Sequence, residues 1–390
     1  MAQSEQRRLF LARIAVSVTF FTVGAIFANW VARIPDVKET LNLSESLLGL
    51  ALMVSSFGVI FGLLITGKLI ARFGSKAVSF YCAIGLALSL AVVSFSTNLL
   101  TLSASLFFLG FFNSTTDVAM NAQGVEVERR YGKPIMNSFH AFWSVGLTTG
   151  ALMGSGFAGA NISFQQHFLI VPVLFILLMI IVRGWLLIID GEQDTADTEP
   201  TFQLPPRALW GLGALAFAAG LSEGALIDWS ALYLTDIVGT SEALAAFGLA
   251  AFSASMVVMR FAGDTVTERL GAVRVVRAGG IAVVLGVGVA LLVPNVWTTI
   301  IGFMVAGLGL AVAIPLAFSA AGKLPNIPPG RGIAGVATIG YAAFLVGPPV
   351  IGFIADATNL RLSFIVVMCL AGTMVYSANA LKVGKSKVKA

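Results

Sequence analysis

Hydrophobic and polar positions alternate along this chain on a long scale. In the first half, residues 14–32, 46–67, 77–116 and 134–182 contain no Asp, Glu, Lys or Arg. A helix that crosses a membrane needs about 20 mostly apolar residues. The first two runs therefore predict one spanning helix each. The two longer runs predict two each, with breaks near residues 96–98 and 161–167, which makes six helices.

The second half repeats this count. Spans are predicted near residues 208–234, 243–262, 273–293, 296–322, 333–355 and 362–381. Between the halves, residues 190–207 carry five acids and three prolines without an apolar run, which predicts a solvated linker. We expect an all-α membrane protein with twelve transmembrane helices. Residues 1–189 and 208–390 would each form a six-helix bundle, joined by a cytoplasmic linker at 190–207.

Composition agrees with a membrane protein. Only 11% of the 390 residues are charged, against roughly 25% in soluble domains, and the mean hydropathy is +0.92. The N-terminal apolar segment is too long for a signal peptide and is better explained as the first span. Two isolated cysteines, Cys82 and Cys369, predict neither a zinc site nor a disulfide framework.

The basic residues predict the orientation. With the N-terminus in the cytoplasm, all but Arg33, Lys38 and Arg361 of the 24 Lys and Arg fall on the cytoplasmic side. The net charge of +5 is then a topology signal and does not indicate nucleic-acid binding. We expect a monomer in a bacterial inner membrane, with both termini cytoplasmic.

An internal repeat links the two halves. "GKLIARFGSKAV" follows the second span and "GDTVTERLGAVRVV" follows the eighth, so that Arg72 and Gly74 match Arg269 and Gly271 at an offset of 197 residues. Parallel repeats of six spans predict two pseudo-symmetric bundles with a binding site between them near the membrane midplane.

These loops resemble the signature of the major facilitator superfamily, Gly-x-x-x-Asp-Arg-x-Gly-Arg/Lys. The first copy has Ala71 where the family has an acid, and the second keeps an acid as Glu268. The resemblance implies the major facilitator fold. It also implies that these loops latch one state of the transport cycle, with gating residues Arg72, Lys76, Glu268 and Arg269.

A narrower resemblance concerns four other stretches. "TTDVAMNAQ" followed by "MNSFHAFWSVGLTTG" is similar to the fucose-permease-like branch of the superfamily. "NWVARIPDVKETLNLSESLLG" and "SEGALIDWSALYL" resemble the subgroup typified by the MosC and YbjJ proteins.

One acid lies within the apolar fourth span. Asn113, Asp117 and Asn121 are spaced by four residues, so they share a face of a helix that turns about 100° per residue. Facing lipid, a carboxylate would cost several kcal/mol, so we expect this polar stripe to face a central cavity. Asp117 is the first candidate for a proton-coupling residue; the alternative is a buried polar clamp between helices.

Two further residues are candidates for proton coupling. His140, early in the fifth span, is expected at a depth similar to that of Asp117, although a structural histidine is an equal alternative. Glu223 lies near the middle of the seventh span and has the same alternative role as a clamp. Arg260 is expected to reach the cytoplasmic surface by snorkelling. His167 is expected in a solvated external loop.

The remaining candidates are residues for gating and for substrate. Arg33 and Asp228 are expected to pair at the external mouth when the outer gate closes. Amides and aromatic rings suit a hydroxylated solute, and the candidate substrate-binding residues are Asn29, Trp30, Asn113, Asn121, Asn137, Trp143, Trp229 and Tyr341.

The sequence predicts a transporter rather than an enzyme. It has no metal-ligand spacing and no P-loop, so we expect no metal, no cofactor and no ATP hydrolysis, with a proton gradient as the energy source. Two interpretations stay open. The first is a proton symporter that imports a sugar, polyol or inositol-like solute by alternating access. The second is a proton antiporter that exports a cationic or amphipathic drug or metabolite.

Overall fold

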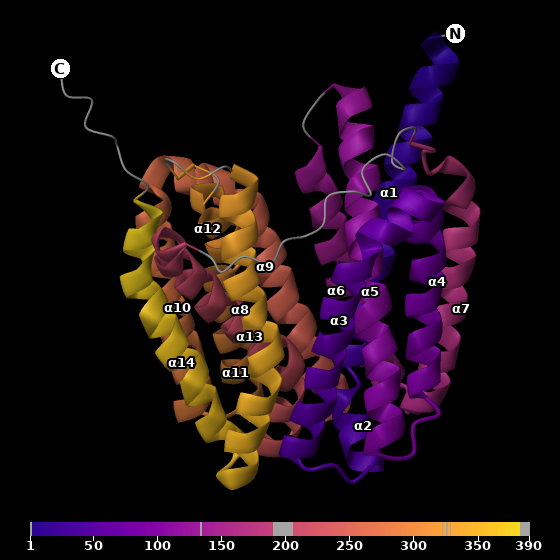
Figure 1. The fold of residues 1–390 in the computed structure, drawn as a ribbon. Coiled ribbons are helices and arrows are strands. Elements are labelled where there is room, and N and C mark those ends of the chain that lie inside the picture. Colours follow the sequence, from indigo (N-terminus) through magenta and orange to yellow (C-terminus); the bar gives the residue numbers. More distant parts are fainter. Residues whose placement is uncertain are drawn as a thin grey trace, which may run out of the picture. The chain divides into compact units, whose positions relative to one another are not determined.

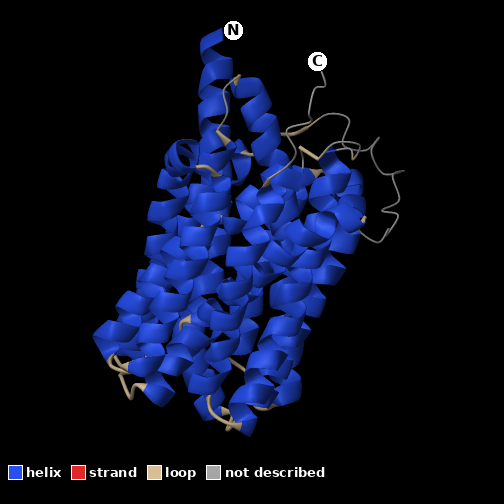
Figure 2. Cartoon of the chain, turned by 90° about the vertical axis from the view of Figure 1, so that its left-hand side faces the viewer, coloured by secondary structure: helices blue, strands red, loops and turns tan. Residues whose placement is uncertain are grey.

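The computed structural model describes residues 2–132, 135–189, 206–321, 323–324, 327 and 329–382. Every regular element in this part of the chain is a helix (Figure 2). The first half contains α1 Ala2–Val31, α2 Ile34–Thr40, α3 Glu45–Phe73, α4 Ser75–Val93, α5 Leu99–Tyr131, α6 Met136–Gly159 and α7 Phe164–Val182. The second half contains α8 Trp210–Leu232, α9 Glu242–Leu270, α10 Ala272–Leu292, α11 Val296–Leu310, α12 Ala313–Ala321, α13 Pro329–Ala357 and α14 Leu360–Ser377.

The helices begin where polar residues cap them. Asn98 accepts a hydrogen bond from the Thr101 N–H and forms a capping box at the start of α5. Ser163 accepts from the Gln166 N–H at the start of α7. Both caps fall at the two breaks that the charge-free runs predict, so those two interruptions are confirmed.

Eleven helical stretches within the described residues are long and apolar enough to cross a membrane. The helix α6, with 24 residues and no charged side chain, lies between two of them and has the length of a span, although its polar residues lower its hydropathy. The all-helical membrane architecture expected from the sequence is therefore confirmed.

Two local features differ from the expected spans. The tenth span is split into α11 and α12, with a break at Ala311 and Val312. Pro315 follows that break, and a proline has no N–H to bond the carbonyl four residues back. The short helix α2 was not predicted. Its second residue is Pro35, whose fixed φ suits the first turn of a helix.

The chain divides into two units. The first comprises Met1–Thr201 and Ser241–Ala250, and the second comprises Phe202–Thr240 and Ala251–Ala390. Residues 241–250, which include the first turns of α9, thus group with the first unit. Of the predicted linker at 190–207, residues 190–205 lie outside the described residues.

In Figure 1, α1 begins at one end of the first unit and α2 lies at the other.

Within the first unit, small residues allow helix backbones to touch. Helices α3 and α5 pack through Gly58 and Gly110, where an added Cβ would lie 2.0 Å from the Phe107 carbonyl oxygen and 2.1 Å from that of Ser55. This is the small-residue packing of helices in membranes, where van der Waals contact replaces the hydrophobic effect.

The second unit uses the same device between α10 and α11. An added Cβ on Gly286 or on Gly302 would lie 2.3 Å from the carbonyl oxygen of the other. An aromatic cluster formed by Tyr233, Phe303 and Phe364 fills the interior of this unit, and the Tyr233 hydroxyl donates to the Ala290 carbonyl at 2.9 Å.

The repeated loops share one backbone geometry. Gly74 has φ 80° and ψ 148°, and Gly271 has φ 82° and ψ 142°. This region is open to glycine and strained for other residues. Each glycine also donates its N–H to the carbonyl four residues earlier, that of Ile70 or Thr267. The sequence match at these two loops is therefore also a structural match.

Candidate functional site

The polar stripe of α5 is held together by its own side chains. Asn121 donates from Nδ2 to the Asp117 carbonyl oxygen at 2.8 Å and to its carboxylate Oδ1 at 3.3 Å. Asn113 lies one turn earlier, and its buried Oδ1 has no hydrogen-bond partner among the described residues. All three side chains are half-buried. The stripe thus offers a carboxylate and an unused amide acceptor on one face of α5.

Asp117 has no basic partner among the described residues. An unpaired charge at membrane depth costs several kcal/mol on insertion scales. A proton that binds this carboxylate removes the charge, so proton binding changes the cost of exposing or enclosing the stripe.

In the second unit, Glu223 on α8 forms an ion pair with Arg260 on α9. The Arg260 Nη2 donates to Glu223 Oε1 at 3.1 Å, and the side chains are 32% and 12% exposed, respectively. The expectation that Arg260 snorkels to the surface is wrong. Its guanidinium instead pairs with the Glu223 carboxylate of α8, and about a third of the side chain stays exposed.

Several hydroxyl and indole groups in this unit are buried without partners among the described residues. Ser230 lies seven residues after Glu223, and Ser253 lies seven residues before Arg260, so each shares a helix face with one member of the ion pair. The Nε1 of Trp229, the residue before Ser230 on α8, is also buried and has no hydrogen-bond partner among the described residues. The pair therefore lies on helix faces that carry unused hydrogen-bonding capacity.

Arg33 lies at the corner between α1 and α2 and is 2% exposed. It donates from Nε to Asp36 Oδ2 at 2.9 Å, from Nη2 to Oδ1 at 2.6 Å, and from Nη2 to the Ile162 carbonyl at 3.1 Å. Glu242, also in the first unit, lies 3.9 Å away. The guanidinium is therefore held by a local acid in this structure, and the predicted pairing with Asp228 stays a prediction.

The candidate substrate residues outside the α5 stripe differ in how deeply they are buried. Asn29, Trp30 and Trp229 are buried in helix packing. Asn29 donates to the Ala25 carbonyl at 2.8 Å and bonds His167 Nε2 through Oδ1 at 2.7 Å, so this amide already has protein partners. The side chain of Asn137 lies outside the described residues. Trp143 is half-buried and Tyr341 is exposed.

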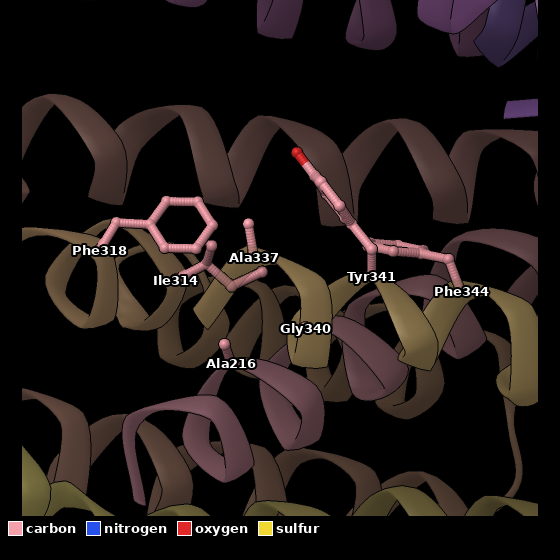
Figure 3. A pocket seen from close by; sticks show the side chains of 7 residues that line it. All are labelled: Ala216, Ile314, Phe318, Ala337, Gly340, Tyr341 and Phe344. Atoms are coloured by element: carbon pink, nitrogen blue, oxygen red, sulfur yellow. The ribbon is translucent and has the colours of Figure 1, made fainter. Parts of the chain in front are cut away.

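Tyr341 borders a small apolar hollow of the second unit. Figure 3 shows its ring and that of Phe344 standing on the same side of α13, with Phe318 on the opposite rim. The remaining lining residues are Ala216, Ile314, Ala337 and Gly340. Apart from the Tyr341 hydroxyl, the side chains that line the hollow are hydrocarbon.

His167 corrects a second expectation. It is fully buried in the first turns of α7, with its ring stacked on Phe157 at a centroid distance of 4.2 Å. It is not a solvated loop residue. His140, by contrast, is exposed and meets the edge of the Phe20 ring at 5.1 Å.

The gating candidates lie near helix ends. The Arg72 guanidinium lies over the Phe73 ring at 5.2 Å, and Lys76 is half-buried in the first turn of α4. Glu268 and Arg269 are exposed at the end of α9.

The sequence did not single out Gln123. This residue is buried and bonds Ser75 Oγ at 2.7 Å, the Leu187 carbonyl at 2.9 Å and the Leu187 N–H at 2.9 Å. Its position as an amide late in an apolar helix was the available signal.

The fold and these polar groups define a multi-pass membrane transporter. The family model of the Major Facilitator Superfamily matches residues 14–226 and 212–384. The chain belongs to the major facilitator superfamily, and its relatives are transporters rather than enzymes.

Relatives match along nearly the whole chain. The uncharacterized transporter y4wD of Sinorhizobium fredii is 35% identical over 96% of this chain and 100% of its own length. An uncharacterized MFS-type transporter of Yersinia pestis is 32% identical over 95% of both chains. The membrane protein MosC of Rhizobium meliloti is 28% identical over 94% of this chain and 88% of its own length.

Solved structures share the fold. A crystal structure of the nucleoside transporter NupG superposes with a TM-score of 0.78 at 12% identity, covering 95% of this chain and 98% of that one. A bacterial homologue of the human lysosomal transporter Spinster gives 0.73 at 14% identity, covering 96% and 97%. At this identity the likeness concerns the fold alone.

Proposed function

We propose that this transporter moves a small hydroxylated solute, such as a sugar, polyol or inositol, by proton symport and alternating access. One observation carries the proposal: each unit places a carboxylate among polar groups on a membrane-spanning helix. Asp117 does so on α5 and Glu223 on α8. Acids inside spanning segments mark substrate and proton pathways in membrane proteins.

The groups beside these acids suit a neutral, hydroxylated solute. The stripe of α5 supplies the amides of Asn113 and Asn121, and an amide both donates to and accepts from hydroxyl groups. The exposed ring of Tyr341 offers a face for the C–H side of a sugar ring. Membership of the fucose-permease-like branch, and of its MosC-like subgroup, is part of the same proposal and is supported by the MosC relative.

The ion pair of the second unit favours import of a neutral solute over export of a cation. Glu223 already has the Arg260 guanidinium as a partner, so it is not a free carboxylate that would attract a cationic drug. Asp117 on α5 and Asp228 on α8 have no such partner among the described residues, so an exporter would have to bind its cation at one of these two acids.

De-energised cells that overproduce the protein distinguish the two functions. The cells are suspended in weakly buffered medium, and inositols, hexoses, polyols and amines are added in turn while the external pH is recorded. A symporter alkalinises the medium when its solute enters, and a protonophore abolishes the signal. Alkalinisation by none of the hydroxylated solutes, together with drug hypersensitivity of a deletion strain, would overturn the proposal in favour of export.

A further inference from the structure

A cluster of three basic residues lies at the end of the first unit that carries the N-terminus. Arg8 comes from α1, Lys76 from the first turn of α4, and Arg183 from the turn that follows α7. The Arg183 guanidinium lies over the rings of Phe80 and Tyr81, about one turn after Lys76 on α4. The charges of Arg183 and Arg8 both act on the Lys76 ammonium group. None of the ion pairs that join described residues includes any of the three. Three segments distant in sequence thus bring like charges together, and no carboxylate of the described residues forms an ion pair with them.

The local backbone adds to this positive charge. The N-cap of α4 is Gly74, which has no side chain to cap the helix, and the first turn contains no acid. The N-terminus of a helix carries a partial positive charge, so Lys76 stands where a cation is unfavourable. The hydroxyl of the next residue, Ser75, is taken by Gln123 at 2.7 Å. An anion bound at this point would offset both the helix dipole and the three side-chain charges.

Arg183 is held in position by aromatic rings. Its guanidinium carbon lies 4.7 Å from the Phe80 ring centre and 5.7 Å from that of Tyr81, and its Nη2 contacts the Tyr81 hydroxyl at 3.4 Å. Phe80 is buried, whereas Tyr81 is 58% exposed. A guanidinium fixed in this way loses little freedom when it binds an anion, and its planar fork suits a phosphate.

The surface beside the cluster is apolar. Ile180 and Ile181, at the end of α7 next to Arg183, and Ile188, five residues after it, are each more than half exposed. Exposed side chains on a membrane-spanning helix, such as Ile180 and Ile181 on α7, contact acyl chains. A phosphate site that borders an acyl-chain surface has the shape of a phospholipid, with a headgroup above and a tail alongside.

We propose that Arg8, Lys76 and Arg183 form a binding site for the headgroup phosphate of an anionic phospholipid, whose acyl chains lie along the outer side of α7. The site is independent of the transported solute. It would anchor the α1, α4 and α7 ends to one leaflet, and the positive-inside bias predicts that this leaflet is the cytoplasmic one.

The test measures how lipid raises the thermal stability of the purified full-length protein in a neutral maltoside detergent. Dioleoyl phosphatidylglycerol and dioleoyl phosphatidylcholine are titrated separately, because they share acyl chains but differ in headgroup charge, and inorganic phosphate forms a third arm. A ligand that binds the folded state raises the apparent melting temperature. The wild type should respond to phosphatidylglycerol at a much lower concentration than to the other two, and high salt should weaken the response.

The variants are Arg8→Gln and the double variant Arg8→Gln/Arg183→Gln, with Arg7→Gln as a control that removes the same charge from the neighbouring position of α1. Each basic residue near an anionic surface contributes about five-fold in affinity, so the single variant should need about five-fold more phosphatidylglycerol and the double variant about 25-fold more. If the double variant fails to fold, Arg8→Gln decides, because Arg8 makes no hydrogen bond to a described residue.

Three results would overturn the proposal. One is an Arg8→Gln response equal to that of the wild type. Another is an equal loss in Arg7→Gln, which would indicate nonspecific surface charge. The third is a response to millimolar inorganic phosphate as strong as the response to phosphatidylglycerol, which would indicate a site for a free anion.

Discussion

Neutralising either member of the Glu223–Arg260 pair should destabilise the second unit, and neutralising both should cost less than the sum. The two atoms are 3.1 Å apart, which places the charge centres about 4 Å apart, and at an effective dielectric constant of about 20 the Coulomb energy is about 4 kcal/mol. Glu223 is 12% exposed and Arg260 is 32% exposed, so water screens part of this attraction. The pair lies between exposed pairs, at about 0.2–1 kcal/mol, and fully buried pairs, at about 3–5 kcal/mol when one partner is removed. We therefore expect a coupling free energy of about 2 kcal/mol.

The assay is a double-mutant cycle on unfolding in mixed micelles, followed by tryptophan fluorescence. The variants are Glu223→Gln, Arg260→Gln and the double variant, with the charge swap Glu223→Arg/Arg260→Glu as a fourth. Each single variant leaves an uncompensated charge, so the double variant should recover about 2 kcal/mol relative to the summed single effects. A coupling below about 0.5 kcal/mol would refute the reasoning, since residues that do not interact are additive within about that margin.

Two further predictions concern packing in the first unit. Gln123→Leu should destabilise the protein by about 2–4 kcal/mol, because it leaves the N–H and the carbonyl of Leu187 without their buried partner. The control Gln166→Leu, at an exposed position, should change the free energy of unfolding little. Equal effects of the two substitutions would count against a stabilising role of the Gln123–Leu187 hydrogen bonds. Gly110→Ala should cost about 1–3 kcal/mol by overpacking, because its Cβ would meet the Ser55 carbonyl oxygen at 2.1 Å. Gly156→Ala has no atom within 4 Å of its added Cβ and should be neutral or slightly stabilising, so melting temperatures that do not differ between the two alanine variants would contradict the α3–α5 contact.

The number of spans could be predicted from charge alone, because a charged side chain facing lipid is costly and the runs without charge are therefore long. Residues that cap helices marked the interruptions equally well, as at Asn98 and Ser163. The break between α11 and α12 was missed, because Ala311 and Val312 are as apolar as their surroundings. There the proline three residues later was the only local signal.

The site was predicted less well, because the partners of polar side chains lie on other helices. The eighth span was expected at residues 243–262, and the membrane-capable stretch Glu242–Gly263 agrees with it, but Arg260 within this stretch pairs with Glu223 on α8. His167 was assigned to a loop, although α7 already begins at Phe164 and the ring Nε2 bonds to Asn29 Oδ1. A polar residue near a helix end is buried when a partner on another helix satisfies it, and a single sequence does not identify that partner.

The account rests on Asp117 as a group that binds and releases a proton during transport. The most direct measurement uses proteoliposomes containing the Asp117→Asn variant and a labelled solute identified by the alkalinisation screen, with an alkaline interior. The variant should exchange labelled for unlabelled solute across the membrane but fail to accumulate it, whereas the wild type and the exposed-acid control Asp236→Asn should accumulate it until a protonophore is added. Accumulation against the gradient by Asp117→Asn at the wild-type level would contradict the account.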